Sequence, residues 1–205
     1  MNRLSSQDAT RTKGVKRMAG TTAVATALLS GLVGFTGFAG FAGTAHAEGM
    51  SVSSSAFKDS GLLPAEYAGA NECGGKNTSP PLEWKNLPQA THSVVIRMTD
   101  PDGAKGGGVV HWIAYNIPAS VTSLAAGAGN KSGDNITVGK NISGAEAYRG
   151  ACPPVGDTPH HYIITVTATD IAPGSLPPGL DAAGLTVALA GHTLNGSTIV
   201  ARYGR

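Results

Sequence analysis

The chain has 205 residues, of which 14% are charged and 41% hydrophobic, and its 15 Lys and Arg against 13 Asp and Glu give a formal net charge of +2. This length accommodates one domain, or two, with a sizeable core, and it excludes a two-lobed kinase. The 29 Gly and 12 Pro residues, with only 5% aromatic residues, favour a loop-rich β protein.

The positive charge is concentrated at the N-terminus. Residues 1–17 carry five Lys and Arg and one acidic residue, and residues 18–43 form an uncharged run rich in Ala, Gly, Thr and Leu. Ala45-His46-Ala47 follows, with small residues where a signal peptidase cuts. The order predicts a cleavable signal peptide over residues 1–47 and an exported chain, periplasmic or extracellular, over residues 48–205. A membrane anchor that stays attached is the alternative.

Without residues 1–47, the chain keeps 10 Lys and Arg (15 minus five) against 12 Asp and Glu (13 minus one). The remaining cations are scattered, so no basic face is predicted. Duplex nucleic acid is therefore disfavoured as a partner, because it needs several phosphate contacts from one face.

The elements predicted in chain order are mostly strands. A short strand over residues 51–57 is followed by a long surface loop over residues 59–81, which is dense in Gly, Pro, Asn and Ser. Further runs of β-branched and apolar residues predict strands over residues 93–98, 109–117, 162–168 and 197–203. One helix is predicted over residues 181–189, with Asp181 as its N-cap and Gly191 beyond its end. The exported chain is thus predicted to be one β-rich domain.

Two cysteines, Cys73 and Cys152, lie in the exported part. A pair in an oxidising compartment favours one disulfide, and two separate buried thiols are the alternative. An unstrained bridge across a loop of this length would stabilise the fold by about 4 kcal/mol in the chain-entropy model.

Several polar residues lie at strand ends beside turns. Asp100 and Asp102 flank Pro101, His111 lies inside an apolar run, and His160 opens the next strand. A histidine among apolar neighbours needs a hydrogen-bond partner, and Asp100 is a natural one for His111. These residues form either a core cluster whose hydrogen bonds are made within the protein, or a pocket whose hydrogen-bond donors converge on an oxyanion. No G-x-S-x-G elbow and no H-E-x-x-H motif is present in the sequence, so the common serine hydrolases and zinc proteases are poorly supported.

Five segments, in this order and spacing, resemble the phosphatidylethanolamine-binding protein family, and most closely its bacterial branch labelled Raf-kinase-inhibitor-like. They are residues 77–84 (NTSPPLEW), 100–102 (DPD), 111–118 (HWIAYNIP), 150–154 (GACPP) and 160–162 (HHY). The resemblance implies a mainly β fold, in which a central antiparallel sheet packs on a smaller sheet with one or two short helices.

The resemblance also implies an anion pocket near the surface. By position in the motifs, its ligand-binding residues are Asp100, His111, Cys152 (through its backbone N–H), Pro153, His160 and Tyr162. Asp102 would support the pocket from behind, and His161 and Trp112 would point away on alternating faces. One departure concerns the pocket wall: the family pattern Asp-Pro-Asp-Ala-Pro is replaced here by Gly103-Ala104 after Asp102. Without that proline we expect residues 105–108 to be mobile.

These observations favour an exported, non-catalytic protein that binds small phosphorylated or anionic ligands, such as phosphoethanolamine head groups, with peripheral phospholipid contact. No cofactor, metal or catalytic residue is implied. Two alternatives stay open: a hydrolase that uses Asp100, His111 and His160 as acid, base or metal ligands, and a protein-interaction or inhibitor module. The subunit count is open too, with a homodimer as one option.

Overall fold

The computed structural model describes residues 49–205, and the predicted signal peptide lies outside the described residues. The elements of this part of the chain, in order, are β1 (Ser51–Ser53), β2 (Gly61–Leu62), the 3-10 turns η1 (Ala65–Tyr67) and η2 (Asn71–Cys73), β3 (Leu82–Lys85), β4 (Ser93–Asp100), α1 (Gly103–Gly106), β5 (Val109–Pro118), β6 (Ser123–Leu124), β7 (Thr137–Val138), β8 (His160–Thr169), α2 (Ala182–Ala188) and β9 (Thr193–Tyr203).

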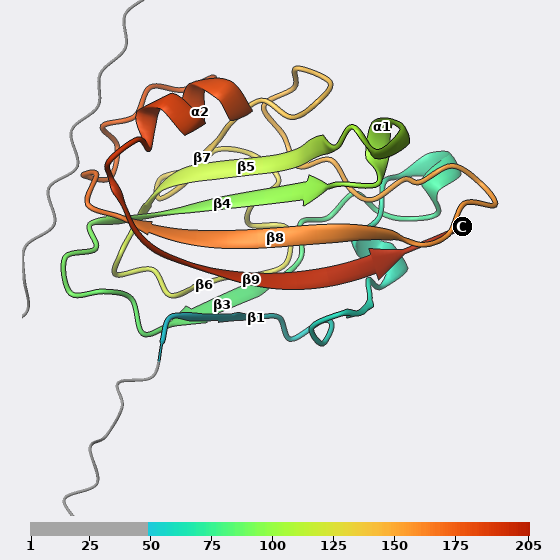
Figure 1. The fold of residues 1–205 in the computed structure, drawn as a ribbon, viewed down its shortest axis with the longest axis horizontal. Coiled ribbons are helices and arrows are strands. Elements are labelled where there is room, and N and C mark those ends of the chain that lie inside the picture. The colour runs from blue at the N-terminus through green and yellow to red at the C-terminus, as the bar shows by residue number, and fades with distance from the viewer. Residues whose placement is uncertain (1–48) are drawn as a thin grey trace, which may run out of the picture. The chain divides into compact units, whose positions relative to one another are not determined.

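The strands form two sheets (Figure 1). The larger sheet has the order β2-β9-β8-β4-β5-β7 and is antiparallel except for the short β2–β9 pair. The smaller sheet has the order β1-β3-β6. This mainly β architecture with two sheets and few helices confirms the predicted fold class.

The alternation of side chains along the long strands gives the larger sheet two buried faces. One face packs toward the smaller sheet, in the core that contains Ile96, Trp112, Ile164 and Trp84 of β3. The other face carries a smaller cluster, in which Val95, Ile113 and Tyr115 contact Leu185 of α2. Burying each of these large side chains contributes about 1.5–3 kcal/mol, so both layers hold the central strands in place.

The predicted elements match the structure best where apolar runs are long. Helix α2 lies within the predicted range, and the Asp181 carboxylate caps it by accepting a hydrogen bond from the Gly184 N–H at 2.8 Å. The first strand ends at Ser53, short of the predicted residue 57. The predicted loop over residues 59–81 contains β2 and both 3-10 turns, so it is more ordered than its composition indicates.

Two segments far apart in the sequence join beside the ends of the long strands. The Gly69 N–H donates to the Ala151 carbonyl at 2.8 Å, and the Gly150 N–H donates to the Asn77 side-chain oxygen at 2.8 Å. A Cβ added at Gly150 would lie 2.4 Å from the backbone of Ala68. The junction is therefore tight enough to require glycine at position 150.

We expect Gly150→Ala to destabilise the protein by about 1–3 kcal/mol, because an extra methyl group must push two backbone segments apart. Urea unfolding of the variant measures this cost. The control is Gly184→Ala in α2, where the added Cβ would meet a flexible Leu180 methyl group at 3.2 Å and alanine favours the helix. Equal stability of the two variants would contradict a tight junction.

Candidate functional site

Three neighbouring strands of the larger sheet bring the predicted polar residues to one end of the fold. Asp100 is the last residue of β4, His160 is the first residue of β8, and His111 lies near the start of β5. Since β8, β4 and β5 are adjacent and antiparallel, these ends meet on one side of the sheet, beside α1 (Figure 1). The topology thus assembles residues that are 60 positions apart in the sequence.

A β-bulge turns His111 toward this end of the core. Met98 pairs with Trp112 and Thr99 pairs with Val110, so His111 is an extra residue opposite β4. Its ring contacts Tyr162 edge-on, with centroids 5.2 Å apart. Trp112 points into the core cluster that also contains Tyr162, so the bulge and not simple alternation sets its direction. His161 is exposed, as the alternation predicts.

The Asp100 carboxylate is 3% exposed and accepts hydrogen bonds on both oxygens. Oδ1 accepts from the N–H groups of Asp102 and Gly103, each at 2.9 Å, in the turn that follows β4. Oδ2 lies 2.8 Å from His160 Nδ1 and 3.7 Å from His111 Nε2. Burial by itself would raise the pKa of Asp100, but the two imidazoles and the Gly103 N–H outweigh it and lower the pKa to about 2. Asp100 is therefore ionised at neutral pH.

The two histidines face different partners through their second nitrogens. His111 Nδ1 lies 3.1 Å from the Arg149 carbonyl oxygen, which can only accept, so this nitrogen carries a proton. His160 Nε2 lies 3.6 Å from the Asp157 carboxylate. Burial would lower the pKa of His160, but the hydrogen bond and charge of Asp100 raise it above its ordinary value. His160 therefore gains a proton more readily than a free imidazole.

A cavity of about 390 Å³ opens over this cluster, and we call it the anion cavity. Of the six predicted ligand-binding residues, Asp100, His111, Cys152 and His160 line it. Asp102 lines it too, and its carboxylate binds the backbone N–H of His161 at 2.7 Å.

The two other predicted ligand-binding residues, Pro153 and Tyr162, are buried and do not line the anion cavity. The Tyr162 hydroxyl has no hydrogen-bond partner of good geometry within residues 49–205, although it is fully buried. Burial and the negative charge of Asp100 raise the pKa of Tyr162, which keeps the hydroxyl protonated.

Sequence reasoning missed three residues of the cavity wall, namely Arg149, Asp157 and Ile142, which line it from the loops on either side of the GACPP motif. Lys105 of α1 also lines it, in the segment that the sequence had already assigned to the pocket wall. Arg149 directly precedes the GACPP motif, and this position was the one sequence feature that could have pointed to it. In the sequence it is one of several scattered cations, and only the fold brings it next to His111.

The turn that replaces the expected proline has an unusual backbone. Ala104 and Lys105 in α1 have φ values of 52° and 60°, in the left-handed region. Proline is fixed near −65°, so it could not adopt the conformation of Ala104. The substitution therefore allows a wall of different shape, which places Lys105 at the anion cavity.

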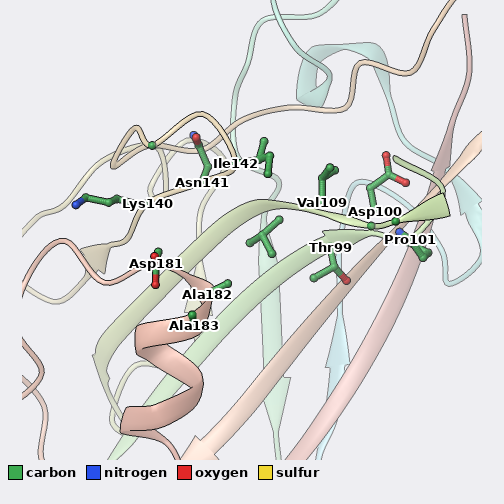
Figure 2. A pocket seen from close by; sticks show the side chains of 14 residues that line it. Thr99, Asp100, Pro101, Val109, Lys140, Asn141, Ile142, Asp181, Ala182 and Ala183 are labelled. Carbon is green, nitrogen blue, oxygen red and sulfur yellow. The ribbon is translucent and has the colours of Figure 1, made fainter. Parts of the chain in front are cut away.

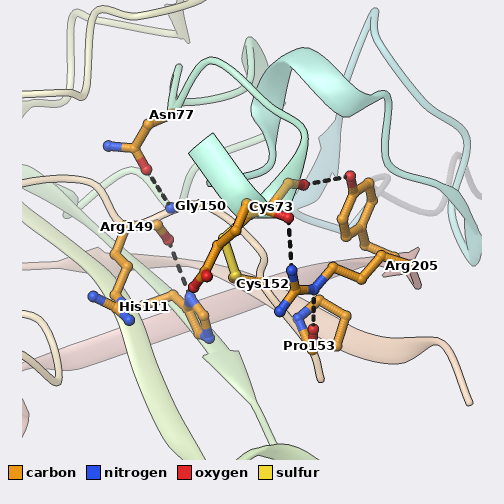
Figure 3. Close-up of a disulfide and its surroundings, with 10 residues drawn as sticks. Cys73, Asn77, His111, Arg149, Gly150, Cys152, Pro153 and Arg205 are labelled. Carbon is orange, nitrogen blue, oxygen red and sulfur yellow. Dashed lines mark hydrogen bonds between the residues drawn. A yellow bond between two sulfur atoms is a disulfide. The ribbon is translucent and has the colours of Figure 1, made fainter. Parts of the chain in front are cut away.

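The opposite wall is fastened by a disulfide between Cys73 and Cys152 (Figure 3). The side chain of Arg205, the last residue, donates to the carbonyl oxygens of Pro153 and Glu72, which follow and precede the two cysteines. The Tyr203 hydroxyl donates to the Cys73 carbonyl at 2.8 Å. Side chains from the C-terminal end thus hold the same two loops that the disulfide joins.

A larger groove of about 780 Å³ adjoins the anion cavity and shares Asp100, Val109 and Ile142 with it. Figure 2 shows Val109 and Ile142 between Asp100 and the start of α2, where Ala182 and Ala183 complete an apolar lining. Ile142 is an exposed large apolar side chain. The polar cluster therefore has an apolar surface beside it.

Within residues 49–205, the group of potential metal ligands whose atoms converge is Glu72 with Cys73 and Cys152, whose sulfurs are joined in the disulfide. Asp100, His111 and His160 do not form such a group. In the part of the chain that the structure describes, no helix has the length and apolarity needed to span a membrane.

The geometry defines the class of this protein: a two-sheet β fold with a cluster of a carboxylate and imidazoles where strands end. The comparisons with known proteins identify the family. The family model for phosphatidylethanolamine-binding protein matches residues 53–204. The chain is 36% identical to protein YbcL of Escherichia coli (strain K12) over 161 residues, which covers 76% of this chain and 85% of YbcL. The chain belongs to the phosphatidylethanolamine-binding protein family.

Further comparisons agree with this assignment. The crystal structure of Escherichia coli YbcL, described as a new member of the mammalian PEBP family, superposes with a TM-score of 0.70 at 32% identity and covers 76% of this chain and 98% of that chain. LppC of Mycobacterium tuberculosis, named as a candidate lipoprotein, is 35% identical over 133 residues, covering 65% of this chain and 61% of LppC.

We expect Asp100→Asn to lower the free energy of unfolding by about 2 kcal/mol between about pH 4 and about pH 6.5. The lowered pKa of Asp100 means that its contribution is present above about pH 4 and is lost as the pH falls toward 2. The raised pKa of His160 means that its contribution is present below about pH 6.5 and is lost as the pH rises through its folded-state value. Urea unfolding at a series of pH values measures both limits.

The matched control is Asp170→Asn, which removes the carboxylate of an exposed pair with His192 at 2.8 Å. An exposed pair contributes little, so this variant should stay within about 1 kcal/mol of wild type at every pH. A cost for Asp100→Asn that does not change between about pH 2 and about pH 8 would contradict the assigned ionisation.

Proposed function

We propose that this protein is exported and binds small phosphorylated or anionic ligands, such as phosphoethanolamine head groups, in the anion cavity without catalysing a reaction. The observation that carries the proposal is the cluster of Asp100, His111 and His160 at the floor of a cavity that is open to solvent. Protonated imidazoles donate charge-assisted hydrogen bonds to an anion. The carboxylate suits the other half of the ligand, since it accepts from an ammonium group or from a protonated phosphate.

The buried Tyr162 side chain supports the same proposal. Its ring packs edge-on against the His111 ring, with centroids 5.2 Å apart, and so helps to hold that imidazole at the cavity. The apolar groove next to the cavity supports contact with a phospholipid, because an acyl chain attached to a bound head group would meet Val109 and Ile142. Both features are consistent with the name of the family, phosphatidylethanolamine-binding protein.

Export is supported by three independent features. The N-terminal charge pattern and the small residues at Ala45 and Ala47 are typical of a cleaved signal peptide. The disulfide between Cys73 and Cys152 is typical of an oxidising compartment. The relative LppC is named as a candidate lipoprotein, and lipoproteins are exported. The proposed cleavage near Ala47 leaves the whole described domain in the exported chain.

The experiment is calorimetric titration of the protein with phosphate and with phosphoethanolamine between about pH 5 and about pH 8.5, at constant ionic strength. We expect the affinity to rise as the pH falls, because the pKa of His160 is raised and its charged form binds anions more strongly. His160→Gln should lose about tenfold in affinity at the acidic end and little at the basic end.

The control variant is His192→Gln, because His192 is exposed, pairs with Asp170 and, like Asp170, does not line the anion cavity. Titration of the ligand itself affects all three proteins equally, so the difference between the two variants isolates the cavity histidine. A pH profile that is the same for wild type and His160→Gln would overturn histidine-based recognition.

A further inference from the structure

Arg149 is a cation at the anion cavity whose charge no other group uses. Its side chain is exposed and lines the same cavity as His111, and Figure 3 shows its backbone carbonyl hydrogen-bonded to the His111 ring. Within residues 49–205, no carboxylate lies in ion-pair range of its guanidinium. The guanidinium is therefore available to a ligand.

The backbone of Arg149 is held in place from two sides. Its N–H donates to the His111 carbonyl at 3.2 Å, and its carbonyl accepts from His111 Nδ1 at 3.1 Å. The next residue, Gly150, is fixed by its hydrogen bond to the Asn77 side chain at 2.8 Å. This segment lies in the tight junction that ends at the disulfide, so little ordering of the backbone is left for the binding step.

Lys105, the other Lys or Arg of the cavity wall, is placed differently. It lies in the left-handed turn of α1, and Gly106, Gly107 and Gly108 follow it. Its ammonium is a point charge on a long flexible stem, whereas a guanidinium presents parallel N–H groups in a rigid plane. The two cations are therefore expected to contribute unequally.

The charges at the cavity require such a cation. Asp100, Asp102 and Asp157 all line the cavity and would repel an anion. Asp102 is engaged with His161, and Asp100 and Asp157 both face His160. As the pH rises and His160 loses its proton, only fixed cations still offset the carboxylates.

We propose that Arg149 is a specificity-determining residue, whose guanidinium donates two parallel hydrogen bonds to two oxygens of a tetrahedral oxyanion bound over His111. This inference rests on the proposed function and deepens it, because it assigns the ligand a group with two free oxygens at the outer wall. The contribution of Arg149 is independent of pH, since a guanidinium stays charged throughout the working range. It therefore supplies the affinity that persists when His160 is neutral.

The test is titration with inorganic phosphate at about pH 8 of wild type, Arg149→Gln, Arg149→Lys and Lys105→Gln, with thermal unfolding as the check on folding. We expect Arg149→Gln to weaken binding at least about tenfold, Arg149→Lys about threefold or more, and Lys105→Gln less than about threefold. The ratio of affinities between about pH 5 and about pH 8 should increase in Arg149→Gln, because the histidine contribution remains.

Two results would overturn the inference while leaving the proposed function intact: phosphate binding in wild type that Arg149→Gln leaves unchanged, or full affinity in Arg149→Lys, which shows that a point charge is sufficient. An absence of phosphate and phosphoethanolamine binding in wild type at every pH would instead overturn the proposed function itself.

Discussion

The Asp100 carboxylate is buried where three strands end, and much of the surrounding structure supplies hydrogen-bond donors to it. A buried charge without partners costs several kcal/mol, so each of its oxygens must be matched. The turn after β4 supplies two N–H groups, and β8 and β5 supply two imidazoles. The arrangement fixes the histidines as firmly as it fixes Asp100. A cavity built around this carboxylate has a rigid polar floor before any ligand arrives.

The walls of the cavity come from segments that have little secondary structure of their own. The GACPP segment is held by backbone hydrogen bonds to the Gly69 region, by the disulfide and by the Arg205 side chain. On the other side, α1 is a single left-handed turn that no covalent link restrains. The GACPP wall is thus tied to distant parts of the chain, whereas the α1 wall has no such tie. Arg149 lies on the tied wall and Lys105 lies on the other.

Composition and local patterns predicted a β-rich domain, its long strands and α2, because β-branched runs, a capping aspartate and turn residues are local signals. The two-sheet class followed from the resemblance to the family. The cluster of Asp100, His111 and His160 was also accessible from the sequence, through the motifs around those residues. Three features were not. The bulge that turns His111 and keeps Trp112 in the core depends on register between strands, which no local pattern encodes. The burial of Tyr162 and Pro153 depends on how loops close over them. Arg149 needed the fold to bring its loop against β5.

The central claim is that an anion binds beside His111 and His160. Its most direct test is an NMR titration with phosphate that monitors the histidine ring nitrogens at about pH 6.5, where imidazoles exchange protons readily. We expect the signals of His111 and His160 to shift with phosphate concentration and to saturate together, while those of the exposed His92 and His192, which do not line the cavity, stay in place. Saturating shifts at His92 or His192, with His111 and His160 unaffected, would contradict the anion cavity as the binding site.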